Sequence, residues 1–422
     1  MRAMILQVAS ARVADLRAVA REPLFGLYIL GHFATTIGFW MQRIAVGWLA
    51  WRLTGSEAWL GLIAFAELFP SILSSLAGGH LADRFSRVRV MLVGQGLVTC
   101  VSAGLAVGHL TGWLRIEALA GLMVVLGVIA GGMLPSRLAM PHLLVRPEML
   151  ASALALNSTT FNLSRLIGPA LAAPILLTGD AAGVFAASLG ANLAFFLLLL
   201  RIDGRTRRAA RRAGGGSFRS VLADLFRARD LTAVILLQFA QGALLRPASE
   251  LFPAFADEVF RSGPGGLSAL NAAVGVGAII GALGFVKARA DMAALRMVTL
   301  TGGLLCAALG LFGLTSTLWM GAALMVAYGA CMSISNVMAL AYVQGHVAPG
   351  RLGRVLSVYG IVFRVAPALG ALGFGLTAEL AGLPATTILF SVLGGGATLA
   401  FWFAIRGVAP TRAGPADQGS KR

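Results

Sequence analysis

The sequence predicts an all-α polytopic membrane protein with twelve transmembrane helices arranged as two six-helix bundles. Composition is the first observation behind this fold class: 58% of the 422 residues are hydrophobic and only 12% are charged. A soluble domain carries about twice that charged fraction. The second observation is a series of apolar runs, each long enough to cross a bilayer as a helix at about 1.5 Å per residue.

Twelve apolar runs can be counted, and a basic segment divides them six and six. Their approximate bounds are 24–50, 57–77, 90–110, 117–136, 151–178, 182–201, 231–255, 266–287, 296–315, 318–343, 353–379 and 384–405. The basic segment at 202–230 contains several arginines and a run of glycines, which is typical of a flexible linker. We therefore expect an amphipathic cytoplasmic segment at 1–22, bundles at 23–201 and 231–406, and a cytoplasmic tail at 407–422.

Charge is distributed unevenly among the loops. Lys and Arg total 34 against 17 Asp and Glu, which gives a formal net charge of +17. The basic residues collect in alternate loops, among them those holding Arg84, Arg137 and Arg351, so the positive-inside rule places both termini in the cytoplasm. The sequence contains no basic groove interleaved with aromatic residues, so we expect no nucleic-acid binding.

Several function classes lack their sequence signatures. The cysteines Cys100, Cys306 and Cys331 lie inside apolar runs, with a spacing that fits neither a disulfide framework nor a metal site. The sequence has no phosphate-binding Gly-x4-Gly-Lys-Ser/Thr motif and no grouping of His, Asp and Glu typical of intramembrane catalysis. We therefore expect no enzyme activity, no metal and no cofactor. Energy for any transport would come from an ion gradient, or the protein would be a passive uniporter.

Charged residues within the apolar runs are the strongest candidates for function, because each costs about 2.5–3.5 kcal/mol on insertion scales. They are Arg43, Glu67, Arg165, Arg246, Glu250 and Arg364. Such residues either pair structurally between helices or line a transport cavity, and as a set they predict a polar cavity. The neutral polar candidates for that cavity are Gln42, Asn157, Asn162, Gln238 and Gln241. Four tryptophans, by contrast, are interpreted as interface anchors: Trp40, Trp48, Trp51 and Trp59.

A faint internal repeat supports two related halves. Four residues of the fifth run recur 202 positions later in the eleventh run: Leu150, Leu154, Phe161 and Gly168 match Leu352, Leu356, Phe363 and Gly370. Repeats of this kind are common in transporters that are built from two bundles.

The hairpin between the second and third runs carries a recognisable motif. It reads Gly79-x-Leu81-Ala82-Asp83-Arg84-x-x-Arg87. This pattern resembles the loop between helices 2 and 3 of the major facilitator superfamily, although Ser86 and Val88 stand where the family has a glycine and a basic residue.

Two further stretches resemble branches of the same superfamily. The fifth run contains Gly168-Pro169, which resembles the helix-5 motif of the exporters, with alanines in place of its flanking glycines. The end of the first run, residues 38–56, resembles the branch that contains bacterial enterobactin exporters and macrolide-efflux-type permeases.

The resemblance implies a monomeric secondary transporter in the bacterial inner membrane that works by alternating access. Asp83 would latch the cytoplasmic side with Gly79, Arg84 and Arg87, and Glu67 would carry the coupled proton, because a desolvated carboxylate can be protonated. The substrate would be a small amphipathic organic compound, with a siderophore-like or other anionic metabolite and a cationic or neutral drug as alternatives. Import, and a non-transporting scaffold or sensor with a transporter fold, are the competing interpretations.

The resemblance also implies which spans meet. In the superfamily, helices 2 and 11 face each other and helices 1 and 7 approach at the periplasmic end. Counted from the cytoplasmic ends of their runs, Glu67 and Arg364 reach similar depths, and so do Arg43 and Glu250. We therefore expect a Glu67–Arg364 pair at the midplane and an Arg43–Glu250 pair at the outer gate. Arg246 would share the helix face of Glu250, and Arg165 would contact an anionic substrate.

Overall fold

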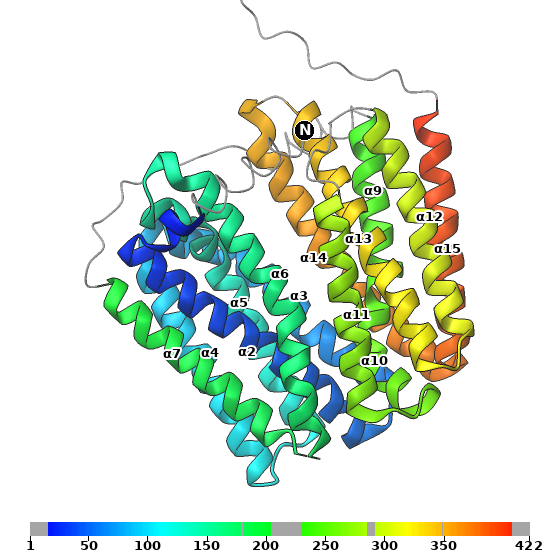
Figure 1. The fold of residues 1–422 in the computed structure, drawn as a ribbon, viewed down its shortest axis with the longest axis horizontal. Coiled ribbons are helices and arrows are strands. Elements are labelled where there is room, and N and C mark those ends of the chain that lie inside the picture. Colours follow the sequence, from blue (N-terminus) through cyan, green and yellow to red (C-terminus); the bar gives the residue numbers. More distant parts are fainter. Residues whose placement is uncertain (1–15, 179, 204–228, 285–291, 348, 407–422) are drawn as a thin grey trace, which may run out of the picture. The chain divides into compact units, whose positions relative to one another are not determined.

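The computed structural model describes residues 16–178, 180–203, 229–284, 292–347 and 349–406 (Figure 1). Within these ranges, twelve helical spans are long and apolar enough to cross a membrane, which confirms the predicted all-α fold class. Most of the expected N-terminal segment, the central linker and the C-terminal tail lie outside the described residues.

The chain forms two compact units, and the first contains six spans. These are α2 (Pro23–Thr54), α3 (Glu57–Arg84), α4 (Arg87–Leu110), α5 (Ile116–Leu144), α6 (Leu150–Leu177, preceded by the 3-10 turn η1, Pro147–Met149) and α7 (Ala182–Asp203). Within this unit α3 packs mainly on α5, and α2 packs on both α6 and α7. The segment Glu250–Ala272 also belongs to this unit, although it lies beyond the central linker in the sequence.

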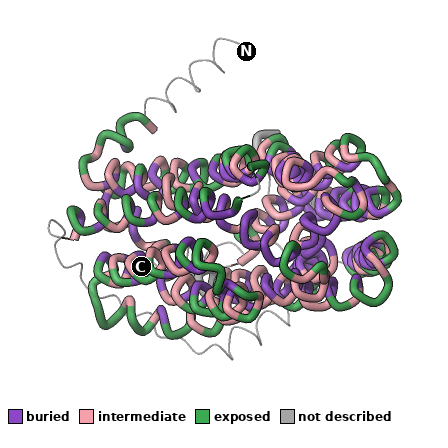
Figure 2. Tube along the Cα trace, turned by 90° about the horizontal axis from the view of Figure 1, so that it is seen from below, coloured by how far each residue is buried: buried purple, intermediate pink, exposed green. Residues whose placement is uncertain are grey.

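The second unit comprises residues 214–249 and 273–422. Its helices are α9 (Arg229–Leu244), most of α11 (Gly263–Gly284), α12 (Met292–Leu314), α13 (Leu318–His346), α14 (Pro349–Ala381) and α15 (Leu383–Ile405). Here α12 packs on α13 and α15, while α9 packs on α14 and α15. In both units, buried positions recur along the helices between exposed ones, as Figure 2 shows.

The seventh span is broken, where the sequence predicted one continuous helix. After α9 the chain forms a 3-10 helix η2 (Arg246–Leu251), a short α10 (Phe252–Ala254) and a π-helical turn η3 (Phe255–Val259). Pro247 and Pro253 explain the break, because proline has no N–H to donate to the preceding turn. The Tyr328 hydroxyl donates to the carbonyl of Leu245 at 2.9 Å, so a backbone acceptor at the break is satisfied.

Several helices run beyond the apolar stretches that identified them. The predicted loop at Gly78–Arg89 is one case: α3 continues to Arg84, and α4 begins at Arg87. Gly79 and Asp83 therefore lie in the last turns of a helix rather than in a loop. The backbone hydrogen bonds of a helix do not depend on side-chain polarity, and Arg84 in the last turn is favourable for the helix dipole.

Glycines set the spacing between α3 and α5. A Cβ atom on Gly127 would collide with the carbonyl oxygen of Glu67, and one on Gly131 would collide with that of Ser71. Gly127 and Gly131 are four residues apart, so they form one small-residue face against which α3 packs at backbone distance. This packing fixes the height of Glu67, which lies on α3 at the contact.

The predicted repeat has matching packing in the two units. Gly168 on α6 lies against α2 at Trp40, and Gly370 on α14 lies against α9 at Ala243. The phenylalanine two helical turns before each glycine also makes a ring contact. Phe161 contacts Trp40, and Phe363 lies under the guanidinium of Arg246. These two of the four matched pairs therefore occupy equivalent places beside the first helix of each half.

Candidate functional site

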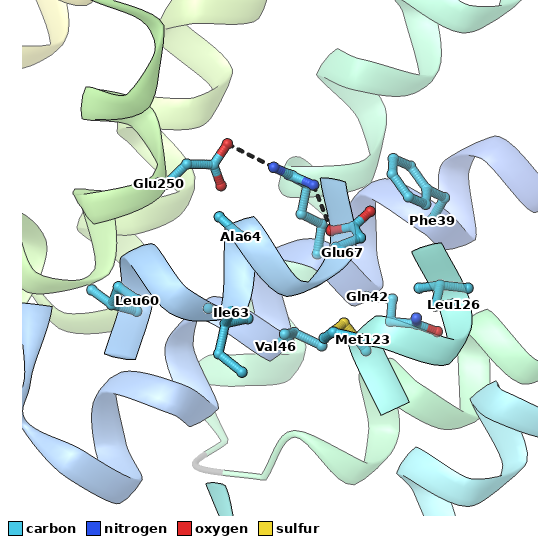
Figure 3. A pocket seen from close by; sticks show the side chains of 12 residues that line it. Phe39, Gln42, Val46, Leu60, Ile63, Ala64, Glu67, Met123, Leu126 and Glu250 are labelled. Carbon is cyan, nitrogen blue, oxygen red and sulfur yellow. Dashed lines mark hydrogen bonds and ion pairs between the residues drawn. The ribbon is translucent and has the colours of Figure 1, made fainter. Parts of the chain in front are cut away.

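The centre of the candidate site is one guanidinium that binds two carboxylates (Figure 3). Nη1 of Arg43 donates to Oε2 of Glu67 at 2.8 Å, and Nη2 donates to Oε1 of Glu250 at 2.6 Å. The three side chains are 20%, 15% and 23% exposed, respectively. All three belong to the first compact unit. We call this group the charge triad.

The geometry of a helical hairpin explains why Arg43 reaches Glu67. Helix α2 ends at Thr54 and α3 starts at Glu57, so the two residues stand at nearly equal distances from the same short turn. Antiparallel helices place such positions at the same level, because each residue rises about 1.5 Å. The turn itself uses Gly55 at φ 58°, a left-handed conformation that favours glycine.

Two expectations about these pairs have different outcomes. The Arg43–Glu250 contact was predicted and is present. Glu67 also binds Arg43, a contact that was not predicted. The expected Glu67–Arg364 pair would join the two units and remains a prediction. The prediction measured depth from the cytoplasmic end of the apolar run at 57–77. Helix α3 extends seven residues further, to Arg84, so the depth of Glu67 is better counted from the turn at Gly55.

The charge triad lies in a pocket that encloses about 440 Å³ of space between atoms, part of it open to the exterior. Most of its walls are apolar, from α2, α3 and α5: Phe39, Val46, Gly47, Leu60, Ile63, Ala64, Met123 and Leu126. Figure 3 shows Glu250 and Glu67 on opposite sides of the guanidinium to which the dashed lines join them. An apolar pocket with few polar groups is the usual form of a small-molecule site.

Gln42 lines the pocket, but its amide oxygen is engaged elsewhere. It accepts from the hydroxyls of Ser102 at 2.9 Å and Ser188 at 3.0 Å. Asn192 donates to Ser102 at 2.9 Å and accepts from Gln95 at 3.0 Å. This buried network joins α2, α4 and α7, so Gln42 holds the helices that carry the pocket.

The candidates on α6 gather beside Trp40. The guanidinium of Arg165 lies 5.6 Å from the centre of a Trp40 ring, and Gly168 packs under the same residue. Pro169 is buried at this crossing of α6 and α2. Asn157 lies on the same face of α6 as Arg165. Asn162 is exposed and donates to the carbonyl of Ser158 on its own helix.

The candidates of the second unit lie on α9, η2 and α14. Gln238 donates to the Ser335 hydroxyl at 3.4 Å, and that hydroxyl donates to Gln241 at 2.9 Å. Arg246 lies 4.1 Å from the centre of the Phe363 ring. Arg246 starts a 3-10 helix, so the α-helical spacing that was expected to align it with Glu250 does not apply. Arg364 is half-buried on α14.

The residues of the predicted latch lie at the end of α3 and the start of α4. Asp83 and Arg84 are exposed, and Arg84 stacks 5.9 Å from the Phe85 ring. A Cβ atom on Gly79 would meet no neighbouring atom within 4 Å, whereas one on Gly78 would collide with Gly132. The glycine that packs closely against α5 is therefore Gly78, which immediately precedes the motif.

Three further residues were missed or misread from the sequence. Trp51, expected at the interface, is buried and donates its indole N–H to Asp257 at 2.9 Å. Trp40 lies in the middle of α2 rather than at its end. Arg137 lies inside α5, close enough to Tyr28 to interact electrostatically, because α5 continues to Leu144. A Trp and an Asp separated by half the chain leave no local pattern that could have predicted their contact.

Metal ligands do not cluster in the part of the chain that the structure describes: those residues contain no group of three or more His, Cys, Asp or Glu suited to a metal ion.

Known proteins resemble this chain in sequence and in fold. Enterobactin exporter EntS of Shigella boydii serotype 18 is 26% identical over 367 residues, which cover 85% of this chain and 86% of the relative. EntS of Escherichia coli O139:H28 matches to the same extent.

Solved transporters share the fold at lower identity. The nucleoside transporter NupG is 13% identical with a TM-score of 0.69, covering 91% of this chain and 99% of its own. A bacterial homolog to the human lysosomal transporter Spinster is 15% identical with a TM-score of 0.71, covering 94% and 99%. The profile of the transmembrane secretion effector family matches residues 17–414, nearly the whole chain, and the protein therefore belongs to this family of major facilitator transporters.

Proposed function

We propose that this transporter exports a small amphipathic organic compound and couples export to the inward movement of protons by alternating access. The observation that carries the proposal is the charge triad, in which Arg43 pairs with both Glu67 and Glu250. The relatives named as enterobactin exporters support the direction of transport.

The charge balance of the triad supports proton coupling. With all three groups ionised, two negative charges surround one positive charge in a mostly apolar pocket. Burial disfavours an uncompensated charge, so protonation of one carboxylate relieves the excess. A carboxylate that is released from Arg43 in one conformation and held in another takes up and releases its proton on different sides of the membrane.

Glu67 is the proposed proton carrier, and Glu250 is the proposed gating partner. Glu67 lies on the continuous helix α3, whereas Glu250 lies in the 3-10 segment of the broken seventh span. Discontinuous helices are typical of transporter segments that change shape during the cycle. Separation of Glu250 from Arg43 would leave Glu67 as the remaining counter-ion.

The other parts of the proposal follow the family pattern. We place the protein as a monomer in the bacterial inner membrane with both termini in the cytoplasm, and a reporter fused after Gly407 should give the cytoplasmic signal. Asp83 is the proposed latch on the cytoplasmic side. Its replacement in Asp83→Asn should leave expression intact and reduce export, whereas normal export by this variant would make the hairpin a simple turn.

Export and coupling can be measured together in inside-out membrane vesicles that are acidified inside and report their internal pH with a fluorescent dye. Two compounds probe the open alternatives: enterobactin as an anionic siderophore and erythromycin as a cationic macrolide. A proton-coupled exporter dissipates the pH gradient when its substrate is added, and Glu67→Gln should abolish this response. Substrate uptake that persists in wild-type vesicles without any proton movement would contradict coupling. If neither compound is moved, the scaffold interpretation is favoured over this export proposal.

A further inference from the structure

A row of four residues on α6 lies along one side of Trp40. Asn157, Phe161, Arg165 and Gly168 are spaced by four, four and three residues, which places them on one face of the helix. Because Gly168 has no Cβ, the backbone of α6 approaches α2 closely at Trp40. A Cβ atom on Gly168 would collide with the Cβ atom of Trp40. This close approach brings the next two residues of the row against the indole.

The row and Trp40 form an aromatic and cationic cluster. The rings of Phe161 and Trp40 meet edge to face with centroids 6.0 Å apart and planes at 65°. Arg165 extends over the indole at 5.6 Å, a distance at which a guanidinium is attracted to the ring face. The charge in this cluster is positive, in contrast to the negative excess of the charge triad.

Two polar atoms in the cluster are buried without a hydrogen-bond partner. One is Nε1 of Trp40, which is a donor, and the other is Oδ1 of Asn157, which is an acceptor. Buried polar atoms in native proteins are nearly always bonded, and unbonded ones call for an explanation such as a ligand. The Trp40 donor, next to the Arg165 guanidinium, suits an anionic oxygen. The Asn157 acceptor lies one turn before Phe161 on the same face of α6 and suits a hydroxyl of the same ligand.

The cluster borders a polar, accessible face of α6. Ser158 and Asn162 are exposed one turn apart, and Arg165 follows at the next turn of the same face. Such a polar stripe is costly against lipid, so it is expected to face a water-filled cavity. Phe161, which is 42% exposed, lies at the edge of this stripe.

The depth of the cluster is that of a transporter binding site. Trp40 lies near the middle of the 32-residue helix α2, and Arg165 lies near the middle of the 28-residue helix α6. Substrate sites of secondary transporters are usually found near the bilayer midplane.

We propose that Trp40, Asn157, Phe161 and Arg165 bind an aromatic acid group, a ring that carries a carboxylate or phenolate, on the transported compound. The anion contacts Arg165 and the Trp40 N–H, the ring packs on Phe161 and the indole, and a ring hydroxyl donates to Asn157. This inference rests on the proposed transport function, and it adds the chemical class of the group that is recognised.

Binding of small probes to the purified full chain in lipid nanodiscs tests the site without requiring transport. The probes are 3-hydroxy-2-naphthoate, its non-aromatic counterpart cyclohexanecarboxylate, and the aromatic cation 2-naphthylmethylammonium, all measured by isothermal titration calorimetry. We expect 3-hydroxy-2-naphthoate to bind at least tenfold more tightly than either of the others. Equal binding of the three, or binding of none, would overturn the assigned class.

Variants separate the roles within the cluster. Arg165→Gln should weaken binding of 3-hydroxy-2-naphthoate at least tenfold, and Trp40→Phe, which keeps a ring but removes the N–H, should weaken it severalfold. The matched controls are Arg406→Gln and Trp402→Phe, because Arg406 stacks on Trp402 at 3.3 Å at the end of α15. These two should bind as wild type does. Unchanged binding by folded Arg165→Gln would refute the site.

Cysteine labelling keeps the proposal testable if a cluster variant fails to fold. In a chain whose native cysteines are replaced by alanine, Ser158→Cys should react with a charged methanethiosulfonate reagent, and 3-hydroxy-2-naphthoate should slow that reaction. The exposed apolar position Leu197 on α7 provides the lipid-facing control, as Leu197→Cys. Labelling of Ser158→Cys that the probe does not slow would contradict the site.

The binding and transport results can fail separately. Arg165-dependent binding without export would retain the aromatic acid site and remove the proposed export function. Export of a compound that competes with none of the probes and is unaffected in Arg165→Gln would retain the function and remove the site.

Discussion

Trp51 on α2 donates its indole N–H to Oδ2 of Asp257 at 2.9 Å, and this contact lies two helical turns beyond Arg43. Asp257 belongs to the π-helical turn that follows Glu250 on the broken seventh span. The same segment is therefore held on α2 at two places, by an ion pair at Glu250 and by a hydrogen bond at Asp257. Pro253, between them, packs against Gly47 of α2.

A double-mutant cycle should show that the Trp51–Asp257 hydrogen bond contributes on its own. Hydrogen bonds to charged groups contribute about 1.5–3 kcal/mol, and we expect a coupling free energy of about 1.5 kcal/mol for this half-buried pair. The measurement compares the unfolding free energies of Trp51→Phe, Asp257→Ala and the double variant. Strictly additive losses would show that the two side chains do not interact.

The charge triad makes a prediction about the order of stabilities. Arg43→Gln leaves two carboxylates without their cation, so it should cost about 3–5 kcal/mol, the typical loss when a buried pair is broken. Glu67→Gln should cost less, because Arg43 keeps Glu250 at 2.6 Å. The order can be measured by heating the purified variants and monitoring unfolding as the loss of the monodisperse peak. The triple variant with Gln at Arg43, Glu67 and Glu250 should be more stable than Arg43→Gln, and the reverse order would contradict a shared guanidinium.

The fold was largely predictable, because long apolar runs in the sequence identify the helices that can span a membrane. The expected runs at 182–201 and 384–405 differ by one or two residues from α7 and α15. The errors arise where a helix leaves the hydrocarbon region and continues on backbone hydrogen bonds alone, as at Gly78–Arg84 of α3. The break in the seventh span had a visible signal in Pro247 and Pro253, but the type of helix that follows each proline depends on packing.

The sequence predicted which residues form the site better than it predicted which of them contact each other. Intramembrane charges identified Arg43, Glu67 and Glu250, because the cost of burying each one makes it conspicuous. The Arg43–Glu250 contact was predicted, whereas the Arg43–Glu67 contact was not, because it depends on the position of the turn between α2 and α3. The indole of Trp40 was misread, because a tryptophan in the middle of a helix and one at the interface look alike in sequence.

Close packing of α6 on α2 predicts opposite effects of alanine at two glycines. A Cβ at Gly168 collides with Trp40, so Gly168→Ala should destabilise the protein by about 1–3 kcal/mol, the usual cost of overpacking. A Cβ at Gly190 on α7 would meet no atom within 4 Å, so Gly190→Ala should be neutral or slightly stabilising. Melting temperatures of the two variants provide the measurement. Equal stability of both would show that α6 and α2 can separate without cost.

Asp180 lies outside the membrane-spanning helices, between the end of α6 at Leu177 and the start of α7 at Ala182. Nε2 of His109, at the end of α4, is 2.9 Å from Oδ1 of Asp180, which precedes α7. The same oxygen accepts from the backbone N–H of Ala182 at 2.8 Å, where α7 begins. This backbone hydrogen bond, together with His109, holds the pKa of Asp180 below its ordinary value. A negative charge at this place also favours the helix dipole of α7.

The lowered pKa of Asp180 predicts a loss of stability in acid. A carboxylate whose pKa is lower in the folded than in the unfolded chain stabilises the fold above its unfolded pKa, about 3.9, and that contribution disappears as the pH falls through the folded pKa. Asp180→Asn keeps an oxygen for the Ala182 N–H but cannot titrate, so its melting temperature should lie below that of wild type at pH 6 and approach it below about pH 4. Other carboxylates titrate in both proteins, and the difference between the two curves isolates this one. A constant difference from pH 6 to pH 3 would show that the charge of Asp180 does not stabilise the start of α7.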